Sequence, residues 1–392
     1  MEIVCFSHLR WDFVFQRPQH LLTRLADHFR IYYIEEPLFY QEKDHYSELI
    51  HNNNIHIIKL HLKGSAEDAN VTDRQQLLIR NLFFKHKIND YILWYYTPMA
   101  LKMTRGLNPV TTVYDCMDEL SAFRFADPAL KKMEKELLSK ADVVFCGGNN
   151  LYNAKKHMHS NIHAFPSSID KKHFGAARHI IQDPPDQAKI PTPRFGYYGV
   201  IDERFDIELI RQVADRKPDW QFILIGPVVK IDPETLPRSK NIHYLGSKKY
   251  NELPAYLSGW DISLVSFALN ESTQFISPTK TPEYLAGGKP VISTPIKDVV
   301  DTYGKSGMVH IINNADEFIE TAEKELAVKD KHAWLQIVDK HLANNSWEIT
   351  VNNMRKILYE AIAEKQIIAE QKKKEKFAET FKLVKDSLPA AS

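Results

Sequence analysis

The sequence predicts an α/β protein built from two tandem, doubly wound parallel-sheet (Rossmann-like) domains. Three observations lead to this fold class. Short apolar runs alternate with helix-length amphipathic stretches, which is the pattern of strand–helix–strand units. The alternation breaks over residues 175–193, a proline-rich and polar segment that is typical of an interdomain linker. The chain of 392 residues is also long for one core and suits two domains of ordinary size.

The first half of the chain, residues 1–174, contains the elements of the first predicted domain. Leu22, Leu25 and Phe29 recur at helical spacing after the first apolar run, so a helix follows the first strand. The same alternation continues to the linker. The predicted strands span residues 2–9, 30–36, 55–62, 91–98, 111–118 and 141–148, and further helices lie near 73–86, 127–140 and 149–157.

The second predicted domain spans residues 194–345 and repeats the alternation. After it, residues 346–370 carry an apolar stripe at alternating steps of four and three residues, which predicts a long packed helix. The members of this stripe are Trp347, Val351, Met354, Leu358 and Ala361. The predicted strands of the domain are 194–200, 220–227, 241–246, 261–269 and 308–314, with helices at 206–216 and 249–258.

Residues 371–392 form a charged tail. Our first interpretation is a solvated, fraying helix, because runs of charge usually face water. The alternative is a basic amphipathic segment that touches an anionic membrane surface. The sequence leaves both open.

Composition excludes several classes of function. The net charge of +1 gives no general attraction to nucleic acid. The three scattered cysteines form no CxxC spacing, and His157 and His159 have no nearby carboxylates, so we expect no protein-held metal and no other cofactor. The N-terminus lacks the pattern of a signal peptide, and no apolar run approaches the ~20 residues that span a bilayer. We therefore expect a cytoplasmic protein, with peripheral membrane contact as the alternative.

The stretch "FISPTKTPEYLAGGKPVIST" (residues 275–294) predicts an anion site. Ser277-Pro278 and Thr281-Pro282 are two successive helix-start signals, and we expect a tight turn that resets into a helix at Pro282. A helix start leaves backbone N–H groups unpaired, and Lys280 adds a full positive charge there. A diphosphate is the predicted ligand.

Glu283 does not fit a bare phosphate, because its charge would repel one. It either complements the helix dipole or accepts hydrogen bonds from the paired hydroxyls of a ribose, as acidic residues in nucleotide-binding folds do. The chain has no GxGxxG and no GxxxxGK[ST] after any predicted strand, which argues against the common NAD and ATP loops. Anion and sugar contacts side by side favour a nucleotide ligand.

The first half offers candidates at the carboxyl ends of predicted strands, where ligands of parallel sheets bind. Asp115 and Asp118 could supply a base or hold sugar hydroxyls, or they cap the next helix. Arg17 and Gln19 lie at the first strand-to-helix turn, an anion-favouring place, and are candidate ligand contacts. His20 is a further candidate base, although a lone histidine is more often structural.

The stretch "ISPTKTPEYLAGGKPVIST" resembles the donor-binding motif of GT-B-fold glycosyltransferases, Pro-x-Lys-x-x-Glu-Tyr-Leu-Ala-x-Gly-Lys-Pro-Val. The similarity extends over "FGYYGVIDERFD", "FILIGPV", "IHYLG" and "LPAYLSGWDISLVSF" in the second half. The first half is similar to bacterial members through "FSHLRWDFVFQRPQHLL" and "YDCMDELSAF". The teichuronic-acid type of cell-surface polysaccharide transferase is the subfamily that these segments resemble most.

This resemblance implies a GT-B fold with a central cleft, a C-terminal crossover helix, and transfer of a sugar from a nucleoside diphosphate sugar to a glycan or lipid-linked acceptor. The first domain would bind the acceptor and the second the donor. Lys280 and Arg204 would neutralise the leaving diphosphate, and Glu283 would hold the ribose. Further donor contacts would come from Ser277, Thr279, Asn270 and Thr273.

One position departs from the family pattern. Retaining members usually carry an acidic residue eight positions before Glu283, where this chain has Phe275. Glu271 is the alternative acid. If the reaction inverts the sugar, a general base is required, and Asp118 is the first candidate, followed by Asp115 and His20. A nucleotide-sugar epimerase of the same fold and a non-catalytic nucleotide-sugar-binding partner remain as alternative functions.

Overall fold

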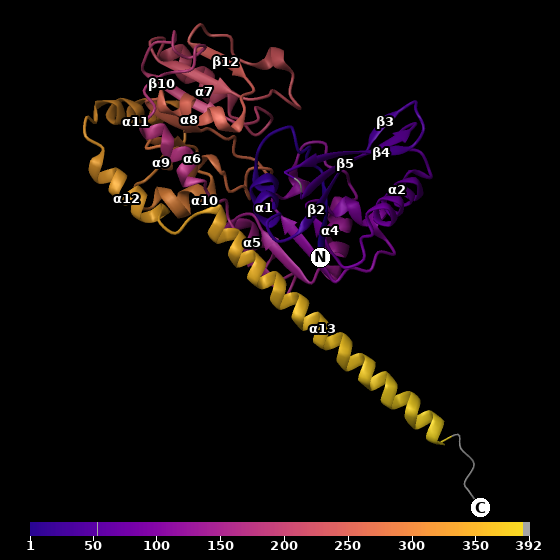
Figure 1. Cartoon of the computed structure of the whole chain (residues 1–392). Helices are drawn as coiled ribbons and strands as arrows, with labels where there is room; N and C mark the ends of the chain where they lie inside the picture. The colour runs from indigo at the N-terminus through magenta and orange to yellow at the C-terminus, as the bar shows by residue number, and fades with distance from the viewer. Residues whose placement is uncertain (53, 387–392) are drawn as a thin grey trace, which may run out of the picture.

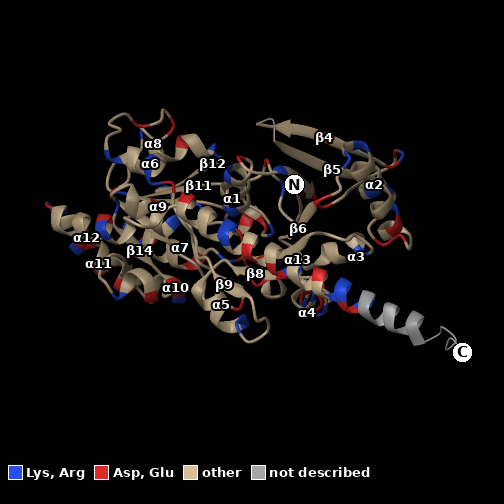
Figure 2. Cartoon of the chain, turned by 60° about the horizontal axis from the view of Figure 1, so that its bottom comes forward, with Lys and Arg blue, Asp and Glu red and all other residues tan. Residues whose placement is uncertain are grey.

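The computed structural model describes residues 1–52 and 54–386, with side chains described through residue 376. Its two lobes are each built around one mainly parallel sheet, and a long helix starts between them and runs past the first domain (Figure 1). Basic and acidic residues are interspersed along both lobes (Figure 2).

The first domain holds a nine-stranded sheet with the order β3-β5-β2-β1-β6-β7-β8-β9, and β4 pairs antiparallel with β5. Glu2 of β1 lies opposite Arg30 of β2 and Tyr91 of β6, so the chain reverses its winding direction at β1. The strands are β1 (Glu2–Ser7), β2 (Arg30–Glu35), β3 (Leu38–Tyr40), β4 (His45–His51), β5 (Ile55–Lys63), β6 (Tyr91–Tyr95), β7 (Thr111–Cys116), β8 (Val143–Cys146) and β9 (Ile162–Ala164).

The helices of the first domain cover both faces of this sheet, because its strands are apolar on both sides. All five residues of β6, for example, are buried. The helices are α1 (Arg17–Leu25), α2 (Val71–His86), α3 (Leu101–Thr104), α4 (Leu130–Lys140) and α5 (Asn149–Lys155). The sequence analysis missed β3, β4 and β9; β4 is mostly polar and exposed, so it lacks the apolar run that marks the other strands.

The second domain holds a six-stranded parallel sheet with the order β12-β11-β10-β13-β14-β15. This is the strand order of a dinucleotide-binding fold, in which ligands bind where the winding reverses, here between β10 and β13. Its strands are β10 (Arg194–Tyr198), β11 (Gln221–Ile225), β12 (Ile242–Gly246), β13 (Ile262–Val265), β14 (Val291–Ser293) and β15 (His310–Ile311). Its helices are α6 (Lys171–Gly175), α7 (Ile207–Arg216), α8 (Leu253–Ser258), α9 (Lys280–Ala286), α10 (Lys297–Val299), α11 (Ala315–Ala327) and α12 (His332–Leu342).

The boundary between the domains lies earlier than the predicted end at residue 174. Ile169 and Phe174 belong to the core of the second domain, and so do Ala177 and Ile190 from the predicted linker of 175–193. Apolar residues at irregular spacing in a proline-rich segment give no periodic signal. The segment is therefore a packed arm of the second domain rather than a free linker.

The long helix α13 (Trp347–Asp386) returns to the first domain. The predicted apolar stripe, Trp347 to Ala361, lies in the same hydrophobic cluster as Leu21 and Leu22 of α1. The helix continues through much of the predicted tail, beyond the packed stripe. Within the described residues, no helix is both long and apolar enough to cross a bilayer.

One set of contacts between the domains joins α5 to α10 and to the segment that follows β13. The Asp298 carboxylate accepts hydrogen bonds from the backbone N–H groups of Asn149 and Asn150, at 3.0 and 2.9 Å. The Asn150 side chain donates to the Gln274 carbonyl at 2.6 Å. Phe275 packs against the core of the first domain. The position of the expected family acid is thus occupied by an apolar contact that holds the domains together.

Candidate active site

The candidate donor site lies at the carboxyl ends of β10 and β13. The backbone turns sharply after β10 at Gly199, which has a φ of +143°. A Cβ at this position would lie 2.2 Å from Cε of Lys280. Gly199 therefore allows the lysine side chain to lie directly against the backbone at the winding reversal.

Lys280 is the first residue of α9, and its amine lies 5.5 Å from the ring centre of Tyr197 and 5.6 Å from that of Phe267. Burial, followed by the charge of Arg204, lowers the Lys280 pKa to about 8. Glu283, one turn on, accepts a hydrogen bond from the Tyr198 hydroxyl at 2.8 Å, and burial raises its pKa to about 7. Burial thus disfavours the charged form of both side chains, and an anionic ligand would offset this cost for Lys280.

The helix start differs from the predicted reset at Pro282. Helix α9 begins at Lys280, with Thr279 rather than Ser277 in the capping position, and Pro282 is its third residue. Proline is tolerated there because the first N–H groups of a helix have no intrahelical partner. The Ser277 carbonyl instead accepts a hydrogen bond from the Ser167 hydroxyl at 2.7 Å.

Arg204 and Lys230 are basic residues of the second domain that contact the first domain. Both cations lie over the ring of Phe123, at 5.1 and 5.4 Å from its centre. Arg204 also pairs with Asp202, whose two carboxylate oxygens accept from its Nε and Nη2 at 2.7–3.1 Å. The Asp202 carboxylate orients the guanidinium and reduces its net charge.

Asp118 faces these cations from the loop after β7. Burial raises its pKa to about 6, while the charges of Arg204, Arg17 and Lys280 oppose this rise. The Asp118 carboxylate thus interacts electrostatically with Arg204 and Lys280, the two residues expected to bind the diphosphate. A carboxylate with this pKa is suited to accept a proton near neutral pH.

Asp115 and Arg17 form a buried ion pair. Arg17 donates to both Asp115 oxygens at 2.8–3.2 Å and to the Phe165 carbonyl at 2.8 Å. Their exposed fractions are 0% and 4%. The pair joins α1 to β7, and breaking it would leave a buried charge. We infer a structural role for both, in place of the predicted catalytic and acceptor roles.

Gln19 and His20 also lie behind the cleft surface. The Gln19 amide donates to the carbonyls of Trp11 and Val14 at 2.7 and 3.1 Å, which fixes the loop before α1. The His20 ring stacks on Trp347, with centroids 4.6 Å apart, and burial holds its pKa well below the ordinary value. This packing is that of a structural histidine.

The loop after β13 is bonded mainly to itself. Asn270 Oδ1 accepts from the backbone of Ser272 and Thr273 at 3.0 and 3.2 Å, and the Thr273 hydroxyl donates to the Ala268 carbonyl at 2.6 Å. Asn270 and Thr273 line a cavity of about 270 Å³ with Pro295. Their predicted ligand contacts, and that of Thr279, remain predictions.

Two buried groups were missed by sequence reasoning. Within the described part of the chain, neither carboxylate oxygen of Glu203 has a hydrogen-bond partner, and the Thr281 hydroxyl has none. Glu203 stands between Asp202 and Arg204 in the turn after β10, and Thr281 follows Lys280. Unpaired buried polar groups are costly, so each is a candidate ligand contact. The sequence could have indicated both residues, because each is adjacent to a predicted site residue.

Two parallel-sheet domains that face one another, with a C-terminal helix crossing back to the first, define the GT-B class of fold, and the chain has this fold. Residues 193–327 match the model of the family described as Glycosyl transferases group 1. The second domain is thus similar to glycosyl transferases of group 1 over most of its length. The resemblance found in the donor motif is confirmed at this level.

Among individual proteins, the chain is similar to TuaH of Bacillus subtilis (strain 168), described as a candidate glycosyltransferase of teichuronic acid biosynthesis. The two are 24% identical over 247 residues, which cover 55% of this chain and 61% of that protein. The chain thus matches about three fifths of the length of this curated relative.

Solved structures support the fold over nearly the whole chain. A sucrose-phosphate synthase from Thermosynechococcus elongatus has a TM-score of 0.70 at 15% identity, covering 92% of this chain and 99% of that one. The trehalose-6-phosphate synthase OtsA has a TM-score of 0.67 at 12% identity, with coverages of 93% and 99%. At these identities the likeness shows the fold alone.

Proposed function

We propose that this chain transfers a sugar from a nucleoside diphosphate sugar to a glycan or lipid-linked acceptor in the synthesis of a cell-surface polysaccharide. The observation that carries the proposal is the pair of cations, Lys280 and Arg204, at the winding reversal of the second sheet, with Asp118 facing them from the first domain. The family match of residues 193–327 supports the reaction class, and the teichuronic acid assignment of the relative supports the kind of product.

In this proposal the second domain binds the donor. Lys280 and Arg204 neutralise the diphosphate, and their partial burial strengthens the attraction by excluding water. Glu283 accepts hydrogen bonds from the ribose. Glu203 accepts from hydroxyls of the donor sugar, which satisfies its unpaired oxygens. Smaller contacts to phosphate and sugar come from Asn270, Thr273, Ser277 and Thr279.

The chemical step uses Asp118 as the general base. Its carboxylate takes the proton of the acceptor hydroxyl while that oxygen bonds to the anomeric carbon. The bond from this carbon to the diphosphate oxygen breaks, and the electron pair leaves with the diphosphate, whose charge Lys280 and Arg204 stabilise. Such a displacement inverts the sugar, and Phe275 in place of the acid of retaining enzymes is consistent with it.

A thermal-shift screen tests the donor assignment. We expect one or more of UDP-, GDP-, dTDP- and ADP-sugars to raise the melting temperature of the full chain, because a ligand of the native state stabilises it. The screen is run both with and without EDTA, because we expect donor binding to need no metal. Failure of every nucleotide at about millimolar concentration would contradict donor binding.

A non-catalytic nucleotide-sugar-binding partner is the second candidate, and Phe275 is the observation that favours it. Calorimetry that shows donor binding, without transfer or hydrolysis over a panel of acceptors, would support it. An epimerase of the same fold would instead convert the donor without any acceptor, which product analysis detects.

The Gly199→Ala variant should weaken donor binding by about tenfold or more. Its Cβ would lie 2.2 Å from Cε of Lys280, so the lysine side chain must move away. The positive φ also costs about 1–3 kcal/mol in backbone strain. The measurement is the affinity for the nucleotide found in the screen. The matched control is Gly307→Ala, at a φ of +71° with nothing within 4 Å of its Cβ. It carries backbone strain without touching the site, so it should lose stability but keep nucleotide affinity.

The end of α13 extends the proposal to the membrane. Lys372, Lys373 and Lys374 lie on a helix that projects past both domains (Figure 1). We propose that this basic segment holds the protein on the inner, anionic face of a membrane, where a lipid-linked acceptor is available. Co-sedimentation with anionic vesicles that is lost at high salt tests it; equal binding to neutral vesicles would count against it.

A further inference from the structure

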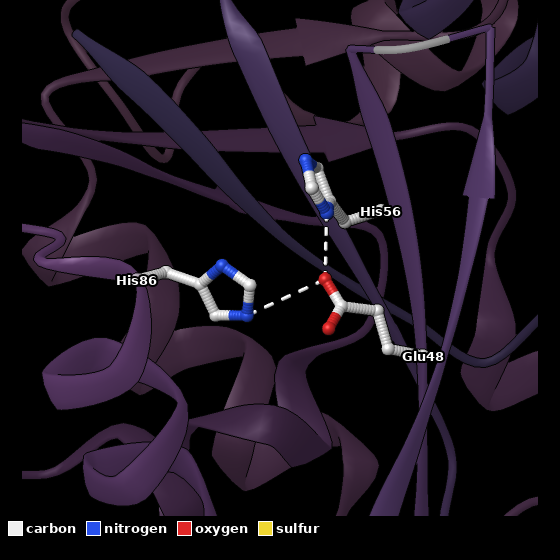
Figure 3. Close-up of side chains that lie close together, drawn as sticks. All are labelled: Glu48, His56 and His86. Carbon is white, nitrogen blue, oxygen red and sulfur yellow. Dashed lines mark hydrogen bonds and ion pairs between the residues drawn. The ribbon is translucent and has the colours of Figure 1, made fainter.

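Three side chains meet at the outer edge of the first domain, away from the cleft. Glu48 lies on β4, His56 on the neighbouring strand β5, and His86 is the last residue of α2. Figure 3 shows both imidazoles directed at the carboxylate of Glu48. Its Oε1 lies 2.7 Å from Nδ1 of His56 and 3.3 Å from Nε2 of His86.

Strand pairing and ring stacking hold these three side chains in place. The antiparallel pairing places Glu48 opposite Ile58, two residues from His56, so both side chains face the same side of the sheet. The buried ring of Tyr32 stacks on His56 with centroids 4.8 Å apart and meets the His86 ring edge-on at 5.1 Å. Tyr32 therefore fixes the orientation of both imidazoles.

We propose that Glu48, His56 and His86 bind a divalent transition-metal ion of the zinc class. The three ligand atoms lie within 4.8 Å of one another. A tetrahedral zinc site with bonds of about 2.0–2.1 Å places its ligand atoms about 3.3 Å apart, so the trio needs only small shifts. Imidazole and carboxylate are ligands that zinc accepts, and three protein ligands leave a fourth position for water.

The second observation is an unpaired nitrogen. Within the residues that the structure describes, Nε2 of His86 is buried and makes no hydrogen bond, although it lies at ion-pair distance, 3.3 Å, from Oε1 of Glu48. A hydrogen-bonded His–Glu–His network would satisfy this atom. A metal ion between the three groups accounts for it, since the nitrogen would then be a ligand.

The Lys85 ammonium would compete with a metal ion for the Glu48 carboxylate. Its amine lies 3.2 Å from Oε2 of Glu48, but its side chain is 58% exposed and can turn into solvent when a cation binds. The ion would link the β4–β5 hairpin, which lies at the sheet edge, to the end of α2. Its role would be to stabilise the edge of the first domain, independent of the sugar-transfer site.

The test uses the full chain, stripped with EDTA and then titrated with Zn²⁺. We expect about one equivalent to bind and to raise the melting temperature, because the ion binds the native state. His86→Gln should weaken binding by more than about tenfold, since even the outer partners of metal ligands are worth roughly 10–100-fold. His61→Gln is the matched control: His61 is on the same strand, outside the trio, and this variant should bind as the unaltered chain does.

A second variant covers the case in which His86→Gln does not fold. Lys85→Ala removes the competing cation and should bind Zn²⁺ more tightly than the unaltered chain. Co²⁺ gives a separate readout: its spectrum should lack thiolate charge-transfer bands, because the three cysteines are buried elsewhere. Absence of binding by the unaltered chain, equal affinity of His86→Gln, or a thiolate spectrum would each overturn the proposal.

Discussion

The Asp118→Asn variant is expected to transfer sugar about 10²–10⁴-fold more slowly, the range that a general base typically contributes. The amide keeps the size and polarity of the side chain but cannot accept the acceptor's proton. Nucleotide affinity should not fall, because the variant removes a negative charge that interacts with Arg204 and Lys280 and so cannot weaken their attraction for a diphosphate. The measurement is kcat/KM with the donor found by thermal shift, together with the Kd for its nucleoside diphosphate.

The pH profile gives an independent check on Asp118. Its carboxyl must be ionised to act as a base, and its pKa is about 6. The rate should therefore fall tenfold per pH unit below about 6, and this limb should vanish in Asp118→Asn. Asp127→Asn, an exposed residue of the same connection, serves as the control and should keep the limb. A full rate for Asp118→Asn would remove this residue from the mechanism.

Stability should move in the opposite direction to activity. Folding raises the Asp118 pKa from 3.8 to about 6, mainly through burial. The stabilisation that follows from this raised pKa is present in full below 3.8 and is lost as the pH rises through about 6. At neutral pH the ionised Asp118 carboxylate thus destabilises the folded state. Asp118→Asn should melt no lower than the unaltered chain, which separates a lost base from a damaged fold.

The sequence predicted the two sheets well because their strands are buried on both faces and read as short apolar runs. It failed where a strand has one exposed side: β4 carries Ser47, Glu48 and His51 among its apolar residues. It also placed the domain boundary too late, because Ile169 and Phe174 join the second core without a periodic pattern. Local pattern thus locates regular buried elements and misses edges and connections.

The candidate site shows the same division. Lys280 and Glu283 were identified because they belong to one local motif. The Arg17–Asp115 pair, whose members stand 98 residues apart, could not be foreseen because it depends on how α1 lies over β7. The trio of Glu48, His56 and His86 likewise comes together only through strand pairing and the end of α2, so the expectation of no metal rested on local spacing alone.

The departure at Phe275 has a physical reason that the motif could not supply. An acid at this position would face the apolar core of the first domain, against which Phe275 packs. Burying a carboxylate there without a partner would cost several kcal/mol. The hydrogen bonds from Asn149 and Asn150 to Asp298 close the same contact. The position where the donor motif leads us to expect an acid is therefore occupied here by a side chain that joins the domains.

The Lys280→Ala variant is expected to lower turnover about 10²–10³-fold, the usual effect of removing one preorganised group that stabilises developing charge. The amine lies in a buried position between Tyr197 and Phe267, where its attraction for a leaving diphosphate is stronger than in water. Because this charge grows as the bond to the anomeric carbon breaks, kcat should fall more than donor affinity does. Single-turnover rates and nucleotide Kd values measure the two effects separately.

Two comparisons make the Lys280 result specific. Lys324→Ala removes an exposed lysine of the same domain that pairs with Glu320, and it should leave turnover unchanged. Lys280→Arg keeps the charge but not the compact ammonium, which Gly199 admits at contact distance, so it should recover only part of the rate. Because the Lys280 pKa is about 8, the unaltered enzyme should also lose rate above that pH, as its amine gives up its charge. A Lys280→Ala enzyme with the unaltered rate and the same alkaline limb would show that the diphosphate is stabilised elsewhere in the cleft.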